Sequence, residues 1–333
     1  MIVHSNLANK RVLVTGAGGF IGSHLTETLL EICAQVRAFV HYNSRNDWGF
    51  LEELSSDAKS SIEVFSSDLR DYHAVKKATR KIDIVFHLGA SISIPYSVAF
   101  PNDVVQTNVM GTLNVLNASL ESEVTKIIHT STSEIYGSAQ YVPIDEKHPL
   151  SPQSPYAASK IAADKFAEAY YHSYNLPITI LRPFNTFGPR QSLRAIIPTV
   201  ITQLFEGNKV IVGNLEPRRD FTFITDTVAG FVMLANKDGV DGQTFNLGTK
   251  KDISIRELID LISRIIGVEP EIEVQQNRIR GNQVEVMQLL SDNTRASKIL
   301  GWQPTFTLEE GLKLTIEWLK TKNNIFKPKI YNI

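Results

Sequence analysis

A glycine-rich turn near the start of the chain constrains the fold more than any other feature. An apolar run at 11–15 predicts a buried strand, and residues 23–31 predict a helix. The turn between them carries Gly16, Gly19 and Gly22, one residue wider at its front than the usual dinucleotide fingerprint. Glycine permits a tight turn and a close approach of backbone to ligand, and a helix N-terminus attracts phosphate. This strand–turn–helix unit therefore predicts dinucleotide binding.

The second predicted strand, at 35–41, bears on which dinucleotide binds. An acidic residue at the end of this strand normally holds the ribose 2′-hydroxyl of NAD. This chain has no acid there, since the strand runs into Val40-His41-Tyr42-Asn43-Ser44-Arg45. Arg45 would suit a 2′-phosphate and would equally suit a solvated loop. The sequence therefore leaves the choice between NAD and NADP open.

Strands and helices alternate through the first half of the chain. This rhythm predicts an α/β fold with a Rossmann-type, doubly wound parallel sheet. Val105, Val109, Leu113 and Leu116 recur at helical spacing, which predicts that all four face the core. Beyond the first two strands, we expect strands at 61–65, 82–87, 126–130 and 177–181, and helices at 72–79, 103–120 and 156–174.

The alternation loosens in the second half. We expect a dinucleotide-binding domain at 1–180 and a smaller, mixed α/β substrate lobe at 181–333, some segments of which return to the first domain. The elements expected here are helices at 197–206, 226–236, 255–266 and 308–320, with short β segments at 209–212 and 244–247.

The near-neutral charge of the chain excludes some classes of partner. Its 333 residues have a formal net charge of −1, which gives no electrostatic reason to expect nucleic acid or an anionic membrane surface. No apolar run approaches the roughly 18 residues that span a bilayer, and the polar start is too short for a secretory signal. The single cysteine, Cys33, rules out an internal disulfide and a thiolate metal cluster. We therefore expect a cytoplasmic protein without a metal.

Polar side chains follow the strand expected at 126–130. Because ligands bind at the carboxyl ends of parallel strands, we expect the run Ser131-Thr132-Ser133-Glu134 at the binding crevice. Tyr156 and Lys160 stand four apart on a helix and so share a face. A cation lowers the pKa of a nearby phenol, which is ~10 when free, so Tyr156 is a candidate base for a sugar or alcohol hydroxyl. A tyrosine and a lysine four residues apart also occur by accident on helices. The other motifs of this chain favour the catalytic interpretation.

From end to end, the chain resembles the nucleotide-sugar epimerases and dehydratases of the extended short-chain dehydrogenase/reductase family. The motifs that carry this resemblance are the glycine turn, the Thr132, Tyr156 and Lys160 set, Asp68-Leu69, His87-Leu88-Gly89-Ala90, Thr107-Asn108-Val109-x-Gly111-Thr112, Arg182-Pro183-Phe184-Asn185, Gly188-Pro189, Arg219-Asp220-Phe221 and Gly301-Trp302-x-Pro304. The resemblance implies NAD as cofactor, with NADP not excluded. It implies cofactor contacts from Gly16, Gly19, Phe20, Ile21, Gly22, Asp68, Leu69, Leu88, Ala90, Tyr156 and Lys160.

The acid at position 134 narrows the resemblance to the dehydratases. Epimerases usually carry Ser-Ser-Ala or similar where this chain has Thr132-Ser133-Glu134. Dehydratases acting on dTDP-glucose generally have aspartate before that glutamate, whereas Ser133 looks more like the GDP-mannose dehydratases. The runs 41–44, 130–137, 141–146 and 278–280 look most like the LegB-type 4,6-dehydratases of legionaminic-acid-type nonulosonate pathways. Pal-like enzymes of pseudaminic acid synthesis, which oxidise C4 of a 5,6-unsaturated UDP-sugar, are also similar.

The subgroup resemblance implies a 4,6-dehydratase acting on UDP- or GDP-linked N-acetylglucosamine. Tyr156, tuned by Lys160 and aided by Thr132, would take the proton of the sugar 4-hydroxyl, and Glu134 would take the C5 proton. A C4 oxidoreductase or epimerase on a UDP-amino sugar or its 5,6-unsaturated derivative is the alternative. A dinucleotide-sensing module without chemistry is a third possibility, against which the intact Thr132, Tyr156 and Lys160 set argues.

Substrate and partner contacts follow from the same resemblance. Guanidinium groups bind phosphate oxygens in a fork, which suits a diphosphate. Relatives form a four-helix dimer contact with the helices that correspond to 103–120 and 156–174, so we expect a homodimer. The expected substrate contacts are Asn185, Arg194, Arg219, Arg280 and Glu285.

Overall fold

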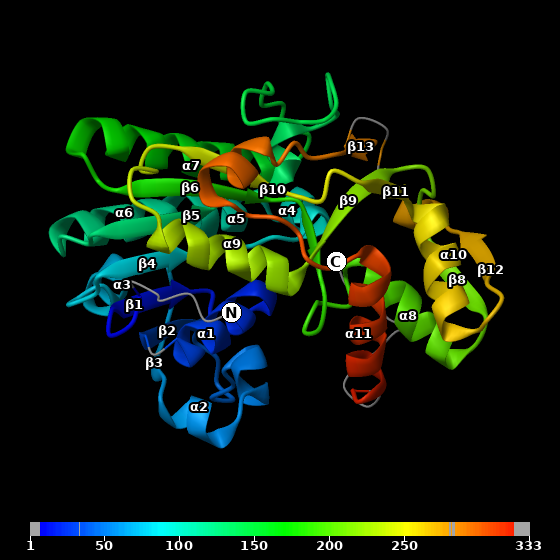
Figure 1. Ribbon diagram of the computed structural model, residues 1–333, viewed down its shortest axis with the longest axis horizontal. Coiled ribbons are helices and arrows are strands. Elements are labelled where there is room, and N and C mark those ends of the chain that lie inside the picture. The colour runs from blue at the N-terminus through cyan, green and yellow to red at the C-terminus, as the bar shows by residue number, and fades with distance from the viewer. Residues whose placement is uncertain (1–6, 33, 280, 282–283, 323–333) are drawn as a thin grey trace.

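A seven-stranded parallel sheet forms the larger lobe of the molecule, on the left in Figure 1. The computed structural model describes residues 7–32, 34–279, 281 and 284–322. The predicted α/β fold with a doubly wound parallel sheet is confirmed. Across the sheet the strands are β10 (Thr244–Leu247), β6 (Ile178–Pro183), β5 (Lys126–Thr130), β4 (Ile84–His87), β1 (Arg11–Thr15), β2 (Gln35–His41) and β3 (Glu63–Ser67).

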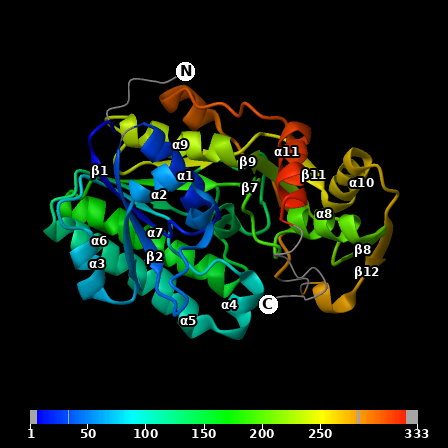
Figure 2. The same cartoon turned by 90° about the horizontal axis from the view of Figure 1, so that it is seen from below.

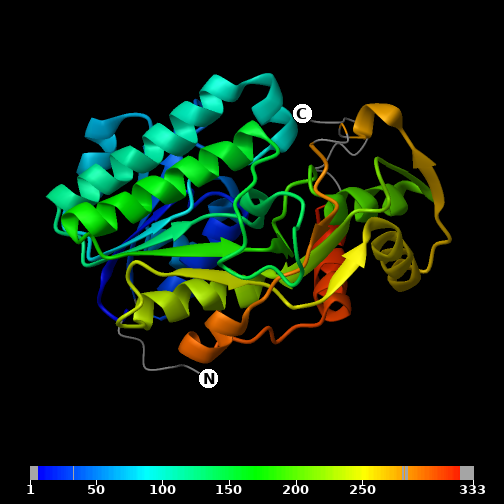
Figure 3. The same cartoon turned by 90° about the horizontal axis from the view of Figure 1, so that it is seen from above.

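Helices cover both faces of this sheet, as the two turned views show (Figures 2 and 3). Alternation along β1 builds the two cores, because Val12 and Val14 face one layer and Leu13 faces the other. The first layer contains α1 (Phe20–Glu31) and α9 (Ile224–Asn236), and the second contains α3 (Tyr72–Ala78), α6 (Gly111–Glu121) and α7 (Pro155–Tyr174). Both α9 and β10 come from the second half of the chain and complete the larger lobe.

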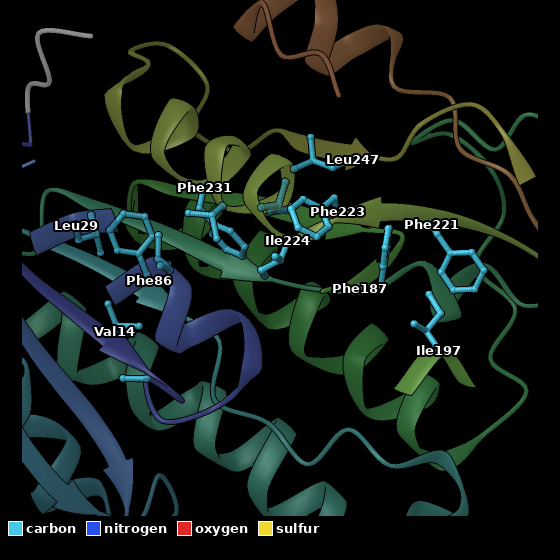
Figure 4. Close-up of a cluster of buried hydrophobic side chains, with 14 of the residues drawn as sticks. Val14, Leu29, Phe86, Phe187, Ile197, Phe221, Phe223, Ile224, Phe231 and Leu247 are labelled. Carbon is cyan, nitrogen blue, oxygen red and sulfur yellow. The ribbon is translucent and has the colours of Figure 1, made fainter. Parts of the chain in front are cut away.

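The smaller lobe, on the right in Figure 1, combines short strands with three helices. Its core is continuous with that of the sheet, since Phe86 and Phe231 lead to Phe187 and Phe223 in one buried cluster (Figure 4). The strands are β7 (Asn185–Phe187), β8 (Lys209–Val212), β9 (Arg218–Phe223), β11 (Asp252–Ser254), β12 (Glu271–Val274) and β13 (Gln288–Leu289), and the helices are α8 (Ile196–Glu206), α10 (Ile255–Ile266) and α11 (Leu308–Lys320).

The helix expected at 103–120 is not uniform. Helix α5 (Pro101–Val105) passes through a π-helical segment, η2 (Gln106–Met110), into α6. The wider turn shifts the register of the apolar stripe. Val105 is therefore 43% exposed, and the prediction that it faces the core is wrong. Val109 and Leu113 are half-buried and lie outside the core cluster, so the prediction is confirmed in full only for Leu116.

Several short helical segments connect the main elements, and the motif analysis predicts none of them. They are α2 (Ser56–Ser60), α4 (Ile94–Ala99), η1 (Gly49–Glu53), η3 (Ser133–Tyr136), η4 (Gln276–Arg278) and η5 (Ala296–Leu300).

Candidate active site

The glycine turn between β1 and α1 has the geometry of a phosphate cradle. Gly16 has a φ of +70°, and a Cβ there would lie under 3.0 Å from the Gly89 backbone. A Cβ on Gly22 would lie under 3.0 Å from Gly16 and Ala17. No side chain caps α1 at Gly19, so the first-turn N–H groups from Phe20 onward have no intrahelical partner. These features fit a bound pyrophosphate.

A loop after β2 supports this turn from outside, which the sequence motifs do not predict. The Phe50 N–H donates to the Gly18 carbonyl oxygen at 2.9 Å. The Asn43 side chain shapes the loop, since its Oδ1 accepts from the N–H groups of Arg45 and Asp47 at 3.1 Å each. The Arg45 side chain is exposed. It lies 3.6 Å from the Asp47 carboxylate, as expected of a solvated loop residue.

The ends of β3 and β4 line the same edge of the sheet. The Thr15 hydroxyl oxygen accepts hydrogen bonds from the N–H groups of Leu88 and Gly89 at 3.1 and 3.0 Å, which fixes the turn leading to Ala90. The Arg70 guanidinium donates hydrogen bonds of 2.6–3.0 Å to the carboxylate oxygens of Asp68, which follows β3. These hydrogen bonds hold the pKa of the Asp68 carboxyl below its usual value. Leu69 follows directly and is buried.

Thr132, Glu134 and Tyr156 come together beyond the carboxyl end of β5. Thr132 caps η3, because its hydroxyl oxygen accepts from the Glu134 N–H at 3.2 Å. The Tyr156 hydroxyl hydrogen-bonds to the Thr132 side chain, and the Glu134 charge acts on the phenol. Ser154 caps α7 by accepting from the Ala157 N–H at 3.1 Å, which sets Tyr156 in the first helical turn. The three side chains therefore lie close together, while their catalytic roles stay a prediction.

Burial dominates the proton affinities of Tyr156 and Lys160. Burial raises the pKa of Tyr156; the Thr132 hydrogen bond opposes that rise, and neighbouring carboxylates add to it. Burial lowers the pKa of Lys160 to about 8, and its ammonium donates to the Thr130 carbonyl oxygen at 2.6 Å. The lowered Tyr156 pKa that pairing with Lys160 predicts is therefore not seen in this structure.

A buried ionic cluster lies one helical turn beyond Lys160, and the motif analysis misses it. One oxygen of Asp164 accepts from the Ser131 hydroxyl at 2.8 Å and from Arg182 at 3.1 and 3.3 Å. The other oxygen accepts from Nε2 of His129 at 3.2 Å. Asp164 and His129 have no exposed surface. The four-residue spacing from Lys160 was the signal that could have found Asp164.

The predicted substrate-binding residues differ in burial and in the contacts that they make. Asn185 opens β7, and its Oδ1 is buried without a hydrogen-bond partner. Arg219, on β9, is 7% exposed and lies 3.5 Å from Glu285. Arg194 lies on an exposed loop, where it contacts Ser192. Arg280 lies outside the described residues. Within the described ranges no group of three His, Cys, Asp or Glu residues is arranged to hold a metal ion.

Comparison with known proteins identifies the family. The GDP-mannose 4,6 dehydratase family matches residues 13–315. UDP-glucose 4-epimerase of Mycolicibacterium smegmatis is 34% identical over 320 residues, which cover 94% of this chain and 99% of that protein. The chain belongs to the nucleotide-sugar dehydratase and epimerase family of extended short-chain dehydrogenases/reductases. Its matched relatives include both reaction types, so family membership alone does not fix the reaction.

Two solved structures of this family superimpose on almost the whole chain. DesIV, a dTDP-glucose 4,6-dehydratase from Streptomyces venezuelae solved with NAD bound, has a TM-score of 0.85 at 27% identity and covers 96% of this chain and 99% of its own. Pal from Bacillus thuringiensis has a TM-score of 0.84 at 30% identity, covering 94% of this chain and 99% of its own. In the described part of this chain, no helix is long and apolar enough to span a membrane.

Proposed function

We propose that this enzyme is a 4,6-dehydratase that converts UDP- or GDP-linked N-acetylglucosamine into a 4-keto-6-deoxy sugar, for nonulosonate (legionaminic- or pseudaminic-type) biosynthesis. The observation that carries the proposal is that the Glu134 carboxylate lies close enough to Tyr156 to act on its phenol, which also hydrogen-bonds to Thr132. A carboxylate at this place suits elimination because it both accepts a proton from carbon and returns one. Epimerisation at C4 has no step that needs such a group.

The proposed cofactor is NAD, held along the glycine turn and the ends of β3 and β4. The free first-turn N–H groups of α1 and the space that Gly16 and Gly22 leave fit its pyrophosphate. Bound there, NAD would supply the hydride acceptor for oxidation at C4 and, in its reduced form, the hydride for C6. The end of β2 bears no acid for the ribose, so NADP remains a second cofactor to assay beside NAD.

The protein side chains move the protons of the reaction. Tyr156 takes the proton of the sugar 4-hydroxyl as C4 is oxidised, and Thr132 orients that phenol. The resulting 4-keto group acidifies the hydrogen on C5, which Glu134 removes, and the C6 hydroxyl leaves as water. Ser133 is buried and carries no acid, so Glu134 in a second role or a bound water protonates the departing hydroxyl. Asn185 and Arg219 are the proposed contacts to the nucleotide diphosphate, which the unpartnered, buried Oδ1 of Asn185 and the burial of Arg219 support.

Incubation with UDP-N-acetylglucosamine and with GDP-N-acetylglucosamine, followed by mass spectrometry, tests the reaction. Loss of one water from one substrate identifies the reaction and the nucleotide together. In deuterated water the product should carry deuterium at C5. A product that keeps its 6-hydroxyl would refute the dehydratase proposal and support an epimerase.

Two variants separate the proposed proton transfers. Glu134→Gln should keep cofactor binding and the transient rise of reduced-cofactor absorbance, yet form no dehydrated product, because only the C5 step is lost. Tyr156→Phe should lose both the absorbance change and the product. Full product formation by Glu134→Gln would remove Glu134 from the mechanism.

A C4 oxidoreductase or epimerase on a UDP-amino sugar or its 5,6-unsaturated derivative is the second candidate. The likeness to Pal and to an epimerase favours it. Such an enzyme would change the configuration or the oxidation state at C4, and its Glu134→Gln variant would stay active.

The proposed location is the cytoplasm, where nucleotide sugars and NAD are made.

The proposed assembly is a homodimer through the outer face of α4, α5 and α7. Val98, Phe100, Val105 and Phe166 are large apolar side chains exposed on these neighbouring helices. Exposed apolar groups gathered on adjacent elements mark interaction sites. A second copy of the same face would cover them.

A further inference from the structure

Three ionisable side chains follow one another along a single face of α7. Tyr156, Lys160 and Asp164 are spaced by four residues and are 8%, 4% and 0% exposed. The proposed mechanism uses the first two. The hydrogen-bond partners of Asp164 are Ser131, His129 and Arg182, none of which belongs to the glycine turn, yet a buried carboxylate is costly unless it is paired and hydrogen-bonded. Its presence one turn below Lys160 therefore calls for a physical account.

Asp164 is held as a carboxylate by groups from three elements. Ser131 and His129 donate from β5, Arg182 donates from β6, and Lys160 faces it from its own helix. Burial raises the pKa of Asp164, but the His129 hydrogen bond and the charges of Arg182 and Lys160 outweigh burial and hold the pKa below its usual value. The group is therefore negatively charged at neutral pH.

The histidine in this cluster is neutral. A carboxylate only accepts hydrogen bonds, so Nε2 of His129 carries the hydrogen and Nδ1 is a bare acceptor. That Nδ1 is buried without a partner, and burial lowers the pKa of the ring. His87, whose ring centroid lies 5.5 Å away, is also buried and has a lowered pKa. Neither ring supplies or removes charge near Lys160.

Lys160 then depends on Asp164 for its charge. Burial favours the neutral amine, and among the groups that act on Lys160 the Asp164 carboxylate is the one that favours the ammonium. The Thr130 carbonyl oxygen, which accepts from Lys160 at 2.6 Å, supplies a dipole but no counter-charge. Arg182 is occupied by Asp164 and by the Tyr136 hydroxyl at 3.0 Å. An ammonium left without its counter-ion in such a site loses its proton.

We propose that Asp164 is a positioning residue whose fixed negative charge keeps Lys160 protonated beneath Tyr156. It acts through Lys160 and touches neither substrate nor cofactor. The proposal deepens the proposed function, because a neutral Lys160 could not favour a Tyr156 phenolate. The effect of the Asp164 charge on the protonation of Lys160 involves only these two residues of the folded protein, however, and so it can be tested without any substrate.

A double-mutant cycle between Asp164→Asn and Lys160→Met, read by urea unfolding from pH 6.5 to 9.5, tests that effect. With Lys160 present, the loss of denaturant midpoint caused by Asp164→Asn should grow as the pH falls below about 8, because the folded wild type then takes up the Lys160 proton, whereas the folded variant, whose Lys160 pKa is lower, does not. With methionine at 160, the loss should be the same at every pH. An equal pH dependence in both backgrounds, or none in either, would overturn the proposal.

Two further variants serve as controls for the double-mutant cycle. Ser131→Ala removes one hydrogen bond to Asp164 but no charge, so its loss of midpoint should not vary with pH. If Asp164→Asn does not fold, the cycle is run on Asp164→Asn/Arg182→Gln, in which no guanidinium is left uncompensated. In that background too, the loss of midpoint should depend on pH only when Lys160 is present, and the same outcomes would overturn the proposal.

A catalytic readout separates this proposal from the choice of reaction. With UDP-N-acetylglucosamine, Asp164→Asn should shift the basic limb of the activity profile to lower pH, and Asp164→Glu should restore it. A variant that lost activity uniformly at all pH would have only a structural defect, against the proposal. If wild-type protein turns over neither nucleotide sugar, the proposed function fails, while the unfolding cycle still decides the role of Asp164.

Discussion

Replacing Lys160 by methionine should stabilise the folded protein at pH 7 while ending catalysis. Burial lowers the pKa of Lys160 from 10.5 to about 8. At ~1.36 kcal/mol per pKa unit, this difference disfavours the folded state by roughly 3 kcal/mol. Methionine removes that cost but also loses the hydrogen bond to the Thr130 carbonyl, which contributes about 1 kcal/mol. The expected net gain in unfolding free energy is about 2 kcal/mol.

The pH dependence of this gain follows from the direction of the shift. The unfolded chain binds the Lys160 proton more tightly, so the cost is complete below pH 8 and disappears as the pH rises to 10.5. Urea unfolding at pH 7 and pH 10 measures both limits. Equal stability of the two proteins at pH 7, or an advantage of the variant that persists unchanged at pH 10, would refute the reasoning.

Lys126→Met is the matched control for the substitution. Lys126 is 8% exposed and also donates to a backbone carbonyl, that of Lys237. It lies at the rim of the sheet, 3.8 Å from the Asp241 carboxylate, so its charge has a partner that water also reaches. Its replacement should bring no gain. A similar gain from both variants would mean that methionine packing, and not the buried charge, is the cause.

The two remaining predictions concern cofactor binding and assembly. Gly22→Ala should abolish NAD binding in a fluorescence titration, because the added Cβ would lie under 3.0 Å from the Gly16 backbone; Gly207→Ala, where a Cβ meets nothing within 4 Å, should bind normally. Phe166→Glu should yield a monomer in light scattering after size-exclusion chromatography, whereas Leu314→Glu, on α11, should remain a dimer. Unchanged NAD affinity in Gly22→Ala, or a dimeric Phe166→Glu, would contradict these expectations.

Features dictated by local geometry were predictable from the sequence. The glycine turn is one, since a Cβ at Gly22 is excluded by atoms only a few residues away. The loop that supports the turn from Asn43 to Phe50 is not local, because its contact with Gly18 depends on where β2 ends relative to β1. The prediction that Val105 faces the core is wrong for a related reason. A π-helical segment shifts the register of the apolar residues, and no residue type in the sequence predicts that segment.

The proton chemistry of the site shows the same limit. Spacing correctly places Tyr156 above Lys160 on one helical face, but spacing carries no information on depth. Burial decides both pKa values, and it overrides the effect that the lysine alone would have on the phenol. Asp164 was visible in principle, as the next residue in the same four-residue series. Its partners on β5 and β6 come from strands that only the fold brings beside α7.

The charge on Glu134 bears on the choice between dehydratase and epimerase. Its carboxylate makes the buried Tyr156 harder to ionise, a direct cost to any enzyme that begins by using a phenolate at C4. An epimerase would gain from a neutral side chain at 134. In a dehydratase the cost is confined to the first step: once Tyr156 has taken the 4-hydroxyl proton it is neutral, the repulsion ends, and Glu134 is the remaining base beside C5. In the proposed dehydratase the two acceptors would therefore act in sequence, C4 before C5, and this order would account for a carboxylate at position 134.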